Sequence, residues 1–141
     1  MNNSLRPFHL AFPVSSIKDT IRWYTTVLNC TIGRQNTNWV DFNFYGHQLS
    51  AHLVNKKKLQ DPTNPVDGKN IPARHFGIIL DMKNWKKLAE DLKNKKLDFI
   101  VGPYIRFKGE KGEQATMFVK DPSDNVLEFK SFKNDSMIFD N

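Results

Sequence analysis

Two parts of the chain change from a short apolar run to apolar residues at helical spacing. In the first, residues 6–14 (RPFHLAFPV) predict a strand, and the segment that follows predicts a helix whose inner face carries Ile17, Ile21, Tyr24 and Leu28. Ser16 can cap this helix, with Asp19 in its first turn. Three short strands are expected next, over residues 31–35, 39–45 and 48–54. The predicted order is strand, helix, strand, strand, strand.

The same order returns in the second half of the chain. Residues 74–80 (RHFGIIL) predict a strand and residues 81–96 an amphipathic helix. Three more strands are expected over residues 97–105, 113–120 and 125–132. His9 and His75 stand at matching places, because each begins a strand that leads into a helix.

The repeat predicts the domain organisation. A length of 141 residues suits a single domain, residues 1–141, with a first module at 6–54 and a second at 75–132. Residues 55–74 contain three prolines and little apolar periodicity, so a linker loop is expected there. The predicted fold class is α+β, with paired βαβββ modules that form a curled mixed sheet around a central cleft.

Charge, cysteine content and hydrophobicity indicate which partners and which cell compartment to expect. The net charge is +6, but the lysines gather mostly in residues 55–60 and 83–96, the latter mixed with acids, which is typical of a solvated loop and helix face. The lone Cys30 can form neither an internal disulfide nor a thiolate metal site, which favours the cytoplasm. No apolar run approaches the roughly 20 residues that span a bilayer. A small-molecule partner is therefore expected, with neither nucleic acid nor a membrane.

Three residues suggest a metal centre. Glu128 lies between Leu127 and Phe129 in an apolar strand, where a carboxylate must be paired, protonated or bound to a cation. If the modules are related by a twofold axis, His9 and His75 can converge on the cleft with it. Two imidazoles and one carboxylate suit a first-row divalent metal and leave coordination positions open. The alternatives are hydrogen-bonded structural histidines and a surface pair between Glu128 and a lysine such as Lys130.

At these residues the chain resembles the vicinal oxygen chelate superfamily, which includes glyoxalase I, extradiol dioxygenases and the bleomycin- and fosfomycin-resistance proteins. The resemblance spans residues 6–132 and depends on the paired modules, His9, His75 and DPSDNVLE. Within the superfamily the chain is most similar to small extradiol-dioxygenase-like proteins, through DFNFYGHQLSAHL, ARHFGIIL, PYIRFKGEKGEQATMF and the closing LEF. The resemblance implies that His9, His75 and Glu128 bind a divalent metal, Fe(II) first, with Zn, Mn, Ni or Co as alternatives.

Two departures from the superfamily pattern affect the interpretation. The turn usually reads Asp-Pro-x-Gly-Asn, whereas Asp124 occupies the glycine position here; Asp can adopt the left-handed conformation at some cost, so the turn is expected to form. Glyoxalase I takes a fourth ligand, a carboxylate, from the strand at residues 48–54, which here offers only Gln48, Ser50 and His52. This absence favours the extradiol set of three ligands, with His52 as a proton-transferring acid or base or as a simple hydrogen-bonding residue.

The segment from Tyr104 to Gln114 carries two glycines and alternating charge, which predicts either a mobile flap or an ordinary hairpin. Tyr104 and Gln114, at its ends, are candidate substrate-binding residues. The expected function is a nonheme iron(II) dioxygenase of the extradiol type, acting on a small catechol-like or aromatic substrate. The alternatives are a glyoxalase-type metal lyase or isomerase and a non-catalytic small-molecule-binding protein. The resemblance also implies a homodimer, with the cleft built within one chain or across two.

Overall fold

The computed structural model describes residues 4–55 and 63–140. The chain divides into two compact units, Met1–Gln60 with Asp121–Ser123, and Asp61–Lys120 with Asp124–Asn141. Each unit contains a four-stranded sheet and a helix in the predicted order, so the α+β class is confirmed. The grouping of both units into one domain stays a prediction.

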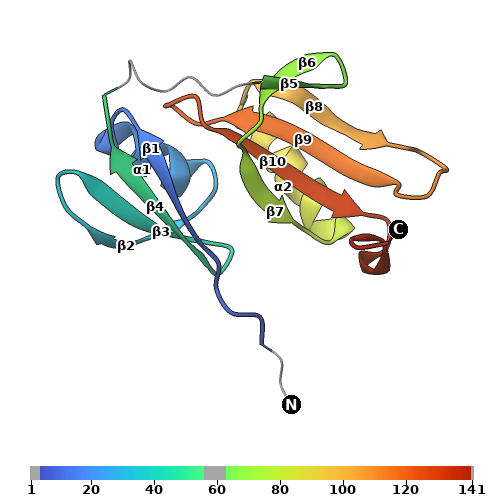
Figure 1. Ribbon diagram of the computed structural model, residues 1–141, viewed down its shortest axis with the longest axis horizontal. Helices are drawn as coiled ribbons and strands as arrows, with labels where there is room; N and C mark the ends of the chain where they lie inside the picture. The colour runs from blue at the N-terminus through green and yellow to red at the C-terminus, as the bar shows by residue number, and fades with distance from the viewer. Residues whose placement is uncertain (1–3, 56–62, 141) are drawn as a thin grey trace. The chain divides into compact units, whose positions relative to one another are not determined.

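The first unit packs one helix on one face of a mixed sheet (Figure 1). Its elements are β1 (His9–Val14), α1 (Ile17–Thr26), β2 (Thr31–Gln35), β3 (Trp39–Phe44) and β4 (His47–Leu53). The sheet order is β1-β4-β3-β2, with β1 parallel to β4 and the other neighbours antiparallel. Ser16 caps α1 as predicted, because its side chain accepts a hydrogen bond from the backbone N–H of Asp19 at 3.2 Å.

The core of the first unit lies between α1 and the sheet. Tyr24 is fully buried and stacks on Phe42 of β3 with ring centroids 5.0 Å apart. Val14 and Leu49 are buried on the same side of the sheet. Because side chains alternate along a strand, the residues between these apolar positions face away from the helix. That second face carries His9, Asp41, Gln48, Ser50 and His52.

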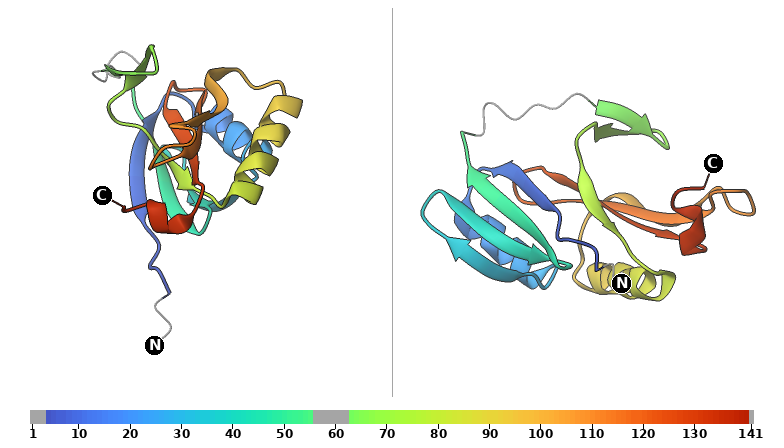
Figure 2. Two further views of the ribbon diagram at one scale, coloured as in Figure 1. Left: turned by 90° about the vertical axis from the view of Figure 1, so that its right-hand side faces the viewer. Right: turned by 60° about the horizontal axis from the view of Figure 1, so that its bottom comes forward.

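The second unit repeats this arrangement. Its main elements are β7 (Phe76–Ile79), α2 (Met82–Asn94), β8 (Phe99–Arg106), β9 (Gln114–Lys120) and β10 (Val126–Phe132), followed by a short 3-10 helix, Asp135–Met137. The sheet order is β7-β10-β9-β8, with β7 parallel to β10, and α2 packs beside this sheet (Figure 2). Asp81 caps α2, and the buried Trp85 indole donates a hydrogen bond to the Phe129 carbonyl at 2.8 Å.

Part of the expected linker loop is a hairpin, so the loop prediction is wrong for residues 63–72. Strands β5 (Thr63–Val66) and β6 (Lys69–Pro72) pair antiparallel across a turn at Asp67 and Gly68, whose φ angles are 48° and 79°. Two consecutive positive φ angles are typical of the type I′ hairpin turn, for which Asp-Gly is a preferred pair. Residues 56–62 of the predicted linker lie outside the described residues.

The connection between β9 and β10 forms the expected turn. Asp124 has a φ of 64°, so it adopts the left-handed conformation that glycine usually supplies. Asp121 stabilises the turn, because its Oδ1 accepts from the backbone N–H of Ser123 at 2.8 Å. Its Oδ2 accepts from the Tyr24 hydroxyl at 3.0 Å, which ties the turn to α1.

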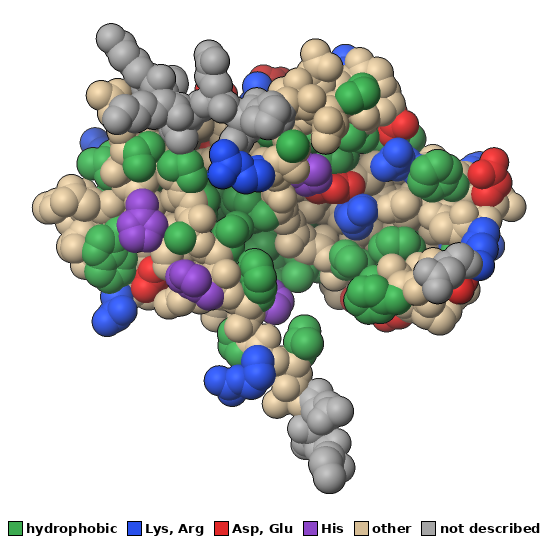
Figure 3. Space-filling model, in the orientation of Figure 1, with side chains coloured by type: hydrophobic (Ala, Val, Ile, Leu, Met, Phe, Trp, Pro, Cys, Tyr) green, Lys and Arg blue, Asp and Glu red, His purple; other side chains and the backbone are tan. Residues whose placement is uncertain are grey.

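Positive charge does not gather into one patch on the face shown in Figure 3. The Lys and Arg side chains there are scattered among acidic, apolar and polar groups. Among the described residues, no helix is both long and apolar enough to cross a membrane.

Candidate functional site

The second unit brings together His75 and Glu128. Glu128 lies in the middle of β10 and pairs in register with Gly77 of the parallel strand β7, two residues after His75. This register places His75 Nε2 3.2 Å from Glu128 Oε2. Two of the three predicted metal ligands are therefore in direct contact.

The Glu128 carboxylate is largely withdrawn from water, with a side chain 10% exposed. Its Oε1 accepts a hydrogen bond from the Thr116 hydroxyl at 2.8 Å, and Lys130 Nζ lies 3.8 Å from the same oxygen. The lysine that sequence reasoning offered as an alternative partner is thus present, but as the longest of the three contacts. Of these three groups, only His75 contacts Oε2, so any hydrogen bond that Oε2 accepts from them must come from the imidazole.

The His75 ring is held on two sides. Its Nδ1 lies 2.9 Å from the Pro72 carbonyl oxygen, and its ring stands edge-on to Phe118 with centroids 5.5 Å apart. A carbonyl can only accept, so Nδ1 carries a proton. In the neutral ring, Nε2 then presents a lone pair to a carboxylate oxygen. Such a pair of acceptors requires a proton or a cation between them, and Nε2 and a carboxylate are ligands that divalent metals take. The donor set of the second unit therefore fits a divalent metal.

His9 lies in the first unit, at the start of β1, with an exposed ring. Its Nδ1 is 2.8 Å from Gln48 Oε1, so Nε2 is the ring nitrogen left for a ligand. Within residues 4–55 and 63–140, no group of three or more His, Cys, Asp or Glu side chains forms a metal-holding cluster in either unit taken alone. The predicted triad combines His9 from one unit with His75 and Glu128 from the other, so the complete triad stays a prediction.

The two sheets can be compared position by position. In the second unit, Glu128 lies opposite Gly77, two residues after His75. In the first unit, Ser50 lies opposite Ala11, two residues after His9. Ser50 therefore occupies the place of Glu128, and strand β4 offers no carboxylate there, as the sequence predicted.

The neighbouring strand does offer a carboxylate. Asp41 lies directly opposite Ser50 on β3 and is 7% exposed. The Ser50 hydroxyl donates to Asp41 Oδ1 at 2.5 Å, and the Gln48 amide nitrogen donates to Oδ2 at 3.3 Å. Sequence reasoning missed Asp41, although a single acid in the aromatic strand WVDFNF was a usable signal of the kind that identified Glu128.

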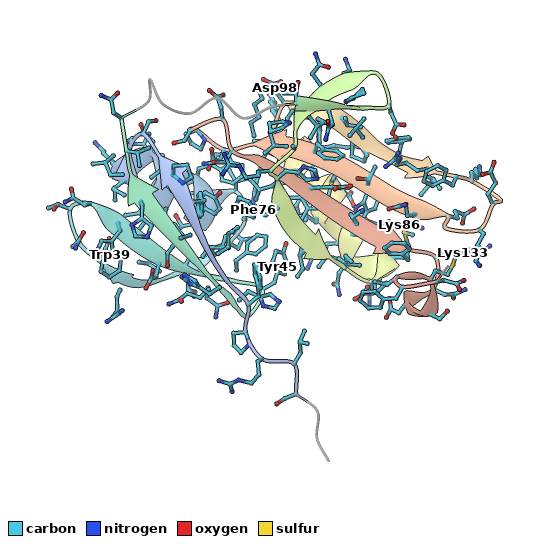
Figure 4. The ribbon with its side chains drawn as sticks, viewed as in Figure 1. Trp39, Tyr45, Phe76, Lys86, Asp98 and Lys133 are labelled. Atoms are coloured by element: carbon cyan, nitrogen blue, oxygen red, sulfur yellow. The ribbon has the colours of Figure 1, made fainter. Side chains whose placement is uncertain are left out.

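Three further predicted site residues, His52, Tyr104 and Gln114, lie on strands β4, β8 and β9. His52 is exposed on β4, directly opposite Trp39, which is labelled in Figure 4. Tyr104 of β8 lies opposite Thr116, and Gln114 begins β9. Within the described part of the chain, the Tyr104 hydroxyl and Gln114 Oε1 are buried without a hydrogen-bond partner. Buried polar atoms of this kind are available to a ligand or a bound water.

Of the predicted flap, residues 104–114, residues 104–106 end β8 and Gln114 begins β9, so the connection between the two strands is residues 107–113. The backbone N–H of Gly109 donates to Glu113 Oε1 at 2.8 Å across this connection. Its mobility stays a prediction.

Each unit has a hollow beside its polar residues. In the second unit a groove of about 220 Å³ is lined by His75, Gly77, Glu128 and Lys130, among others. In the first unit a groove of about 510 Å³ includes Asp41 and Gln48. Ligand pockets for small molecules commonly measure about 300–1,000 Å³, so the groove of the first unit lies within this range and the groove of the second unit lies below it.

Cys30 is not a reactive thiol. Burial raises its pKa to about 11, so it stays protonated at neutral pH. A metal site built from nitrogen and oxygen ligands alone stays a prediction.

Comparison with known proteins identifies the same fold. A family model described as Glyoxalase/Bleomycin resistance protein/Dioxygenase superfamily matches residues 6–129. A solved structure described as glyoxalase/bleomycin resistance protein/dioxygenase, from Alicyclobacillus acidocaldarius, is 32% identical, with 99% of this chain and 100% of that chain covered and a TM-score of 0.82.

More distant structures share the fold. Lactoylglutathione lyase from Agrobacterium tumefaciens is 11% identical, with coverage of 92% and 95% and a TM-score of 0.65. The fosfomycin resistance protein FosX from Listeria monocytogenes is 14% identical, with coverage of 97% and 98% and a TM-score of 0.64. No curated protein sequence matches the chain significantly.

Proposed function

Because the chain belongs to the glyoxalase/bleomycin resistance protein/dioxygenase superfamily, we propose that it is a metal-dependent enzyme of the extradiol dioxygenase type. Its proposed substrate is a small catechol-like or aromatic molecule. The observation that carries the proposal is the contact of His75 Nε2 with Glu128 Oε2 at 3.2 Å, with the opposite ring nitrogen bound to a carbonyl. These atoms are two ligands of a site that His9 would complete.

The number of protein ligands supports this reaction type. Ser50 stands where the second unit has Glu128, so the proposed set has two imidazoles and one carboxylate. His9, His75 and Glu128 would hold a divalent metal, which would supply Lewis acidity toward two neighbouring substrate oxygens and redox chemistry with dioxygen. Iron(II) is the proposed metal, and Zn, Mn, Ni or Co are the alternatives.

The remaining predicted residues act on the substrate in this proposal. The exposed imidazole of His52 takes up or returns the proton of a substrate hydroxyl. Tyr104 and Gln114 bind polar groups of the substrate, because their buried oxygens have no hydrogen-bond partner among the described residues.

A second candidate is a glyoxalase-type metal lyase or isomerase. The observation in its favour is Asp41, a buried carboxylate that lies opposite Ser50 in the first unit. A set of four ligands needs such a carboxylate, and a short movement of the Ser50 and Gln48 side chains would release it. A redox-inert metal would then be expected.

Metal content tests the proposal first. Protein purified without a histidine tag and loaded anaerobically with iron(II) is analysed by elemental mass spectrometry. We expect near-stoichiometric metal in the natural protein and loss of metal in His75→Ala and Glu128→Gln. Glu110→Gln, an exposed acid in the β8–β9 connection, is the matched control and should keep its metal.

The outcomes separate the candidates. Retained iron with oxygen uptake on a catechol panel supports the dioxygenase. Retained zinc, nickel or cobalt with turnover of a glutathione hemithioacetal supports the lyase or isomerase. If the natural protein takes up no metal even after loading, both enzyme proposals are wrong, and a non-catalytic small-molecule-binding protein becomes the working function.

Two further expectations belong to the same proposal. A homodimer is proposed from the sequence resemblance, and sedimentation equilibrium measures it. The cytoplasm is the proposed location, since the lone Cys30 forms no internal disulfide.

A further inference from the structure

Asp41, Gln48 and His9 form a hydrogen-bonded chain on the face of the first sheet that points away from α1. Gln48 Nε2 lies 3.3 Å from Asp41 Oδ2, and Gln48 Oε1 lies 2.8 Å from His9 Nδ1. All three residues belong to the first unit. We propose that Asp41 is a positioning residue, which through Gln48 holds the proton of His9 on Nδ1 and leaves Nε2 free to bind a ligand.

The donor and acceptor roles along this hydrogen-bonded chain follow from the chemistry of Asp41, its first member. An ionised carboxylate can only accept hydrogen bonds, so it fixes the amide nitrogen of Gln48 toward Asp41. A flipped amide would place two acceptors against each other. The amide oxygen must then face His9, and it can only accept. His9 therefore donates from Nδ1, and the lone pair of the neutral ring is on Nε2.

Ser50 binds the second carboxylate oxygen of Asp41, the one that does not face Gln48. Its hydroxyl donates to Oδ1 at 2.5 Å, so the two carboxylate oxygens have separate donors. Asp41 is 7% exposed and Ser50 is 6% exposed, so water competes little for the bond between them, whereas the bond between Gln48 and His9 is exposed. The arrangement is the first unit's counterpart of the Pro72 carbonyl, which faces Nδ1 of His75.

In the proposed metal site, the tautomer of His9 with its proton on Nδ1 is the one that can bind a metal. A histidine ligand needs a bare nitrogen, and groups bound to its other nitrogen orient the ring and raise its basicity. This consequence depends on the proposed function, whereas the tautomer itself is a property of the metal-free first unit.

Nitrogen NMR of the metal-free protein tests the inference. Long-range ¹H–¹⁵N correlation at about pH 8, above the ordinary pKa of imidazole, distinguishes a protonated ring nitrogen from a bare one. We expect His9 to carry its proton on Nδ1. His47 is the internal reference for the opposite tautomer, because its Nδ1 accepts from the backbone N–H of Phe8 at 2.8 Å.

Substitution then tests the part played by Asp41. In Asp41→Asn, the Ser50 hydroxyl keeps its bond to Oδ1, and the new amide nitrogen donates to Gln48. The Gln48 amide flips, and the His9 proton moves to Nε2. Ser50→Ala is the matched control: it removes the other partner of Asp41 and leaves the His9 tautomer unchanged. Gln48→Leu removes the middle member of the hydrogen-bonded chain, so it should also weaken the preference of the His9 proton for Nδ1. This variant serves if Asp41→Asn does not fold.

Zn(II) binding gives a second readout, independent of catalysis. Affinity should fall about 10–100-fold in Asp41→Asn, as is typical when a group that orients a ligand is lost, and stay unchanged in Ser50→Ala. A proton on Nε2 of His9 in the natural protein, or an unchanged tautomer in both Asp41→Asn and Gln48→Leu, overturns the inference. If the tautomer behaves as expected but no protein binds metal, the positioning role stands and the proposed function fails.

Discussion

His9, which begins β1, and His75, which precedes β7, each place Nδ1 against an oxygen acceptor. For His75 the acceptor is a backbone carbonyl, and for His9 it is the Gln48 side chain. A backbone acceptor is fixed by the fold, whereas a side-chain amide can turn over. Single side-chain substitutions should therefore change the ring tautomer of His9 more readily than that of His75.

Tyr24 allows a prediction about stability. Its buried hydroxyl donates to Asp121, so Tyr24→Phe should lower the free energy of unfolding by about 1–3 kcal/mol at neutral pH. Burial, with a further contribution from Asp121, raises the pKa of Tyr24 well above its ordinary value. A raised pKa stabilises the fold below the ordinary tyrosine value and loses this effect as pH rises toward the folded value.

Urea denaturation at neutral pH and at about pH 10–11 measures both effects of Tyr24→Phe. The alkaline loss of stability should be shallower in the variant. Tyr45→Phe, at a side chain 43% exposed, is the control and should cost less at neutral pH. Equal losses in the two variants would contradict the role of the buried hydroxyl.

At the scale of elements, the β5–β6 hairpin supports the second unit's ligand pair. It supplies the Pro72 carbonyl that holds His75, and Ile71 packs with Val101 and Phe118. Asp67 in its turn forms an ion pair with Arg106 Nε of β8 at 3.1 Å. The β5–β6 hairpin, which the sequence pattern predicted to be part of a linker loop, therefore helps to position His75, a predicted metal ligand.

The close approach of β7 and β10 gives a prediction at this scale. A Cβ atom at Gly77 would collide with the backbone of Glu128, so Gly77→Ala must push the strands apart. We expect a loss of about 1–3 kcal/mol in unfolding free energy, together with weaker Zn(II) binding, because His75 moves away from Glu128. Calorimetric titration and urea denaturation measure the two effects.

Gly102→Ala is the matched control on β8. A Cβ atom there meets nothing within 4 Å, and the backbone does not have a positive φ. This variant should bind Zn(II) normally and unfold at the same or slightly higher urea concentration. Normal binding by Gly77→Ala as well would show that the strand spacing does not set the ligand pair.

At the scale of the whole molecule, two units of one architecture carry different side chains at equivalent places. Ser50 replaces a carboxylate in the first unit, and its neighbour Asp41 supplies one from the next strand. The second unit keeps Glu128 and adds the β5–β6 hairpin. The repeat therefore fixes the positions of the polar residues, while their chemistry differs between the units.

Metal binding should stabilise the folded protein as a whole. A ligand that binds only the folded state at 100 times its Kd adds about 2.7 kcal/mol to the free energy of unfolding. Thermal unfolding with and without Zn(II) should show a higher Tm for the natural protein and little change for Glu128→Gln. An equal shift in both proteins would mean that the metal binds elsewhere.

The sequence alone determined the elements of the two βαβββ modules and their order. The apolar periods of the helices and strands are local properties, as are the Ser16 cap and the left-handed turn at Asp124. The equivalence of His9 and His75 also followed from sequence, because the repeat sets their register. The β5–β6 hairpin could have been predicted too, since Asp67 and Gly68 form a preferred turn pair that the surrounding prolines obscured.

Only the tertiary structure decided which polar atoms meet. The contact between His75 and Glu128 depends on the register of two parallel strands far apart in sequence, because a slip of one residue would turn the side chains of one strand to the other face of the sheet. The link from Asp41 through Gln48 to His9 likewise crosses three strands. Hydrogen bonds of this kind form between side chains that the fold brings together, so their donors and acceptors become known only once the sheets are assembled.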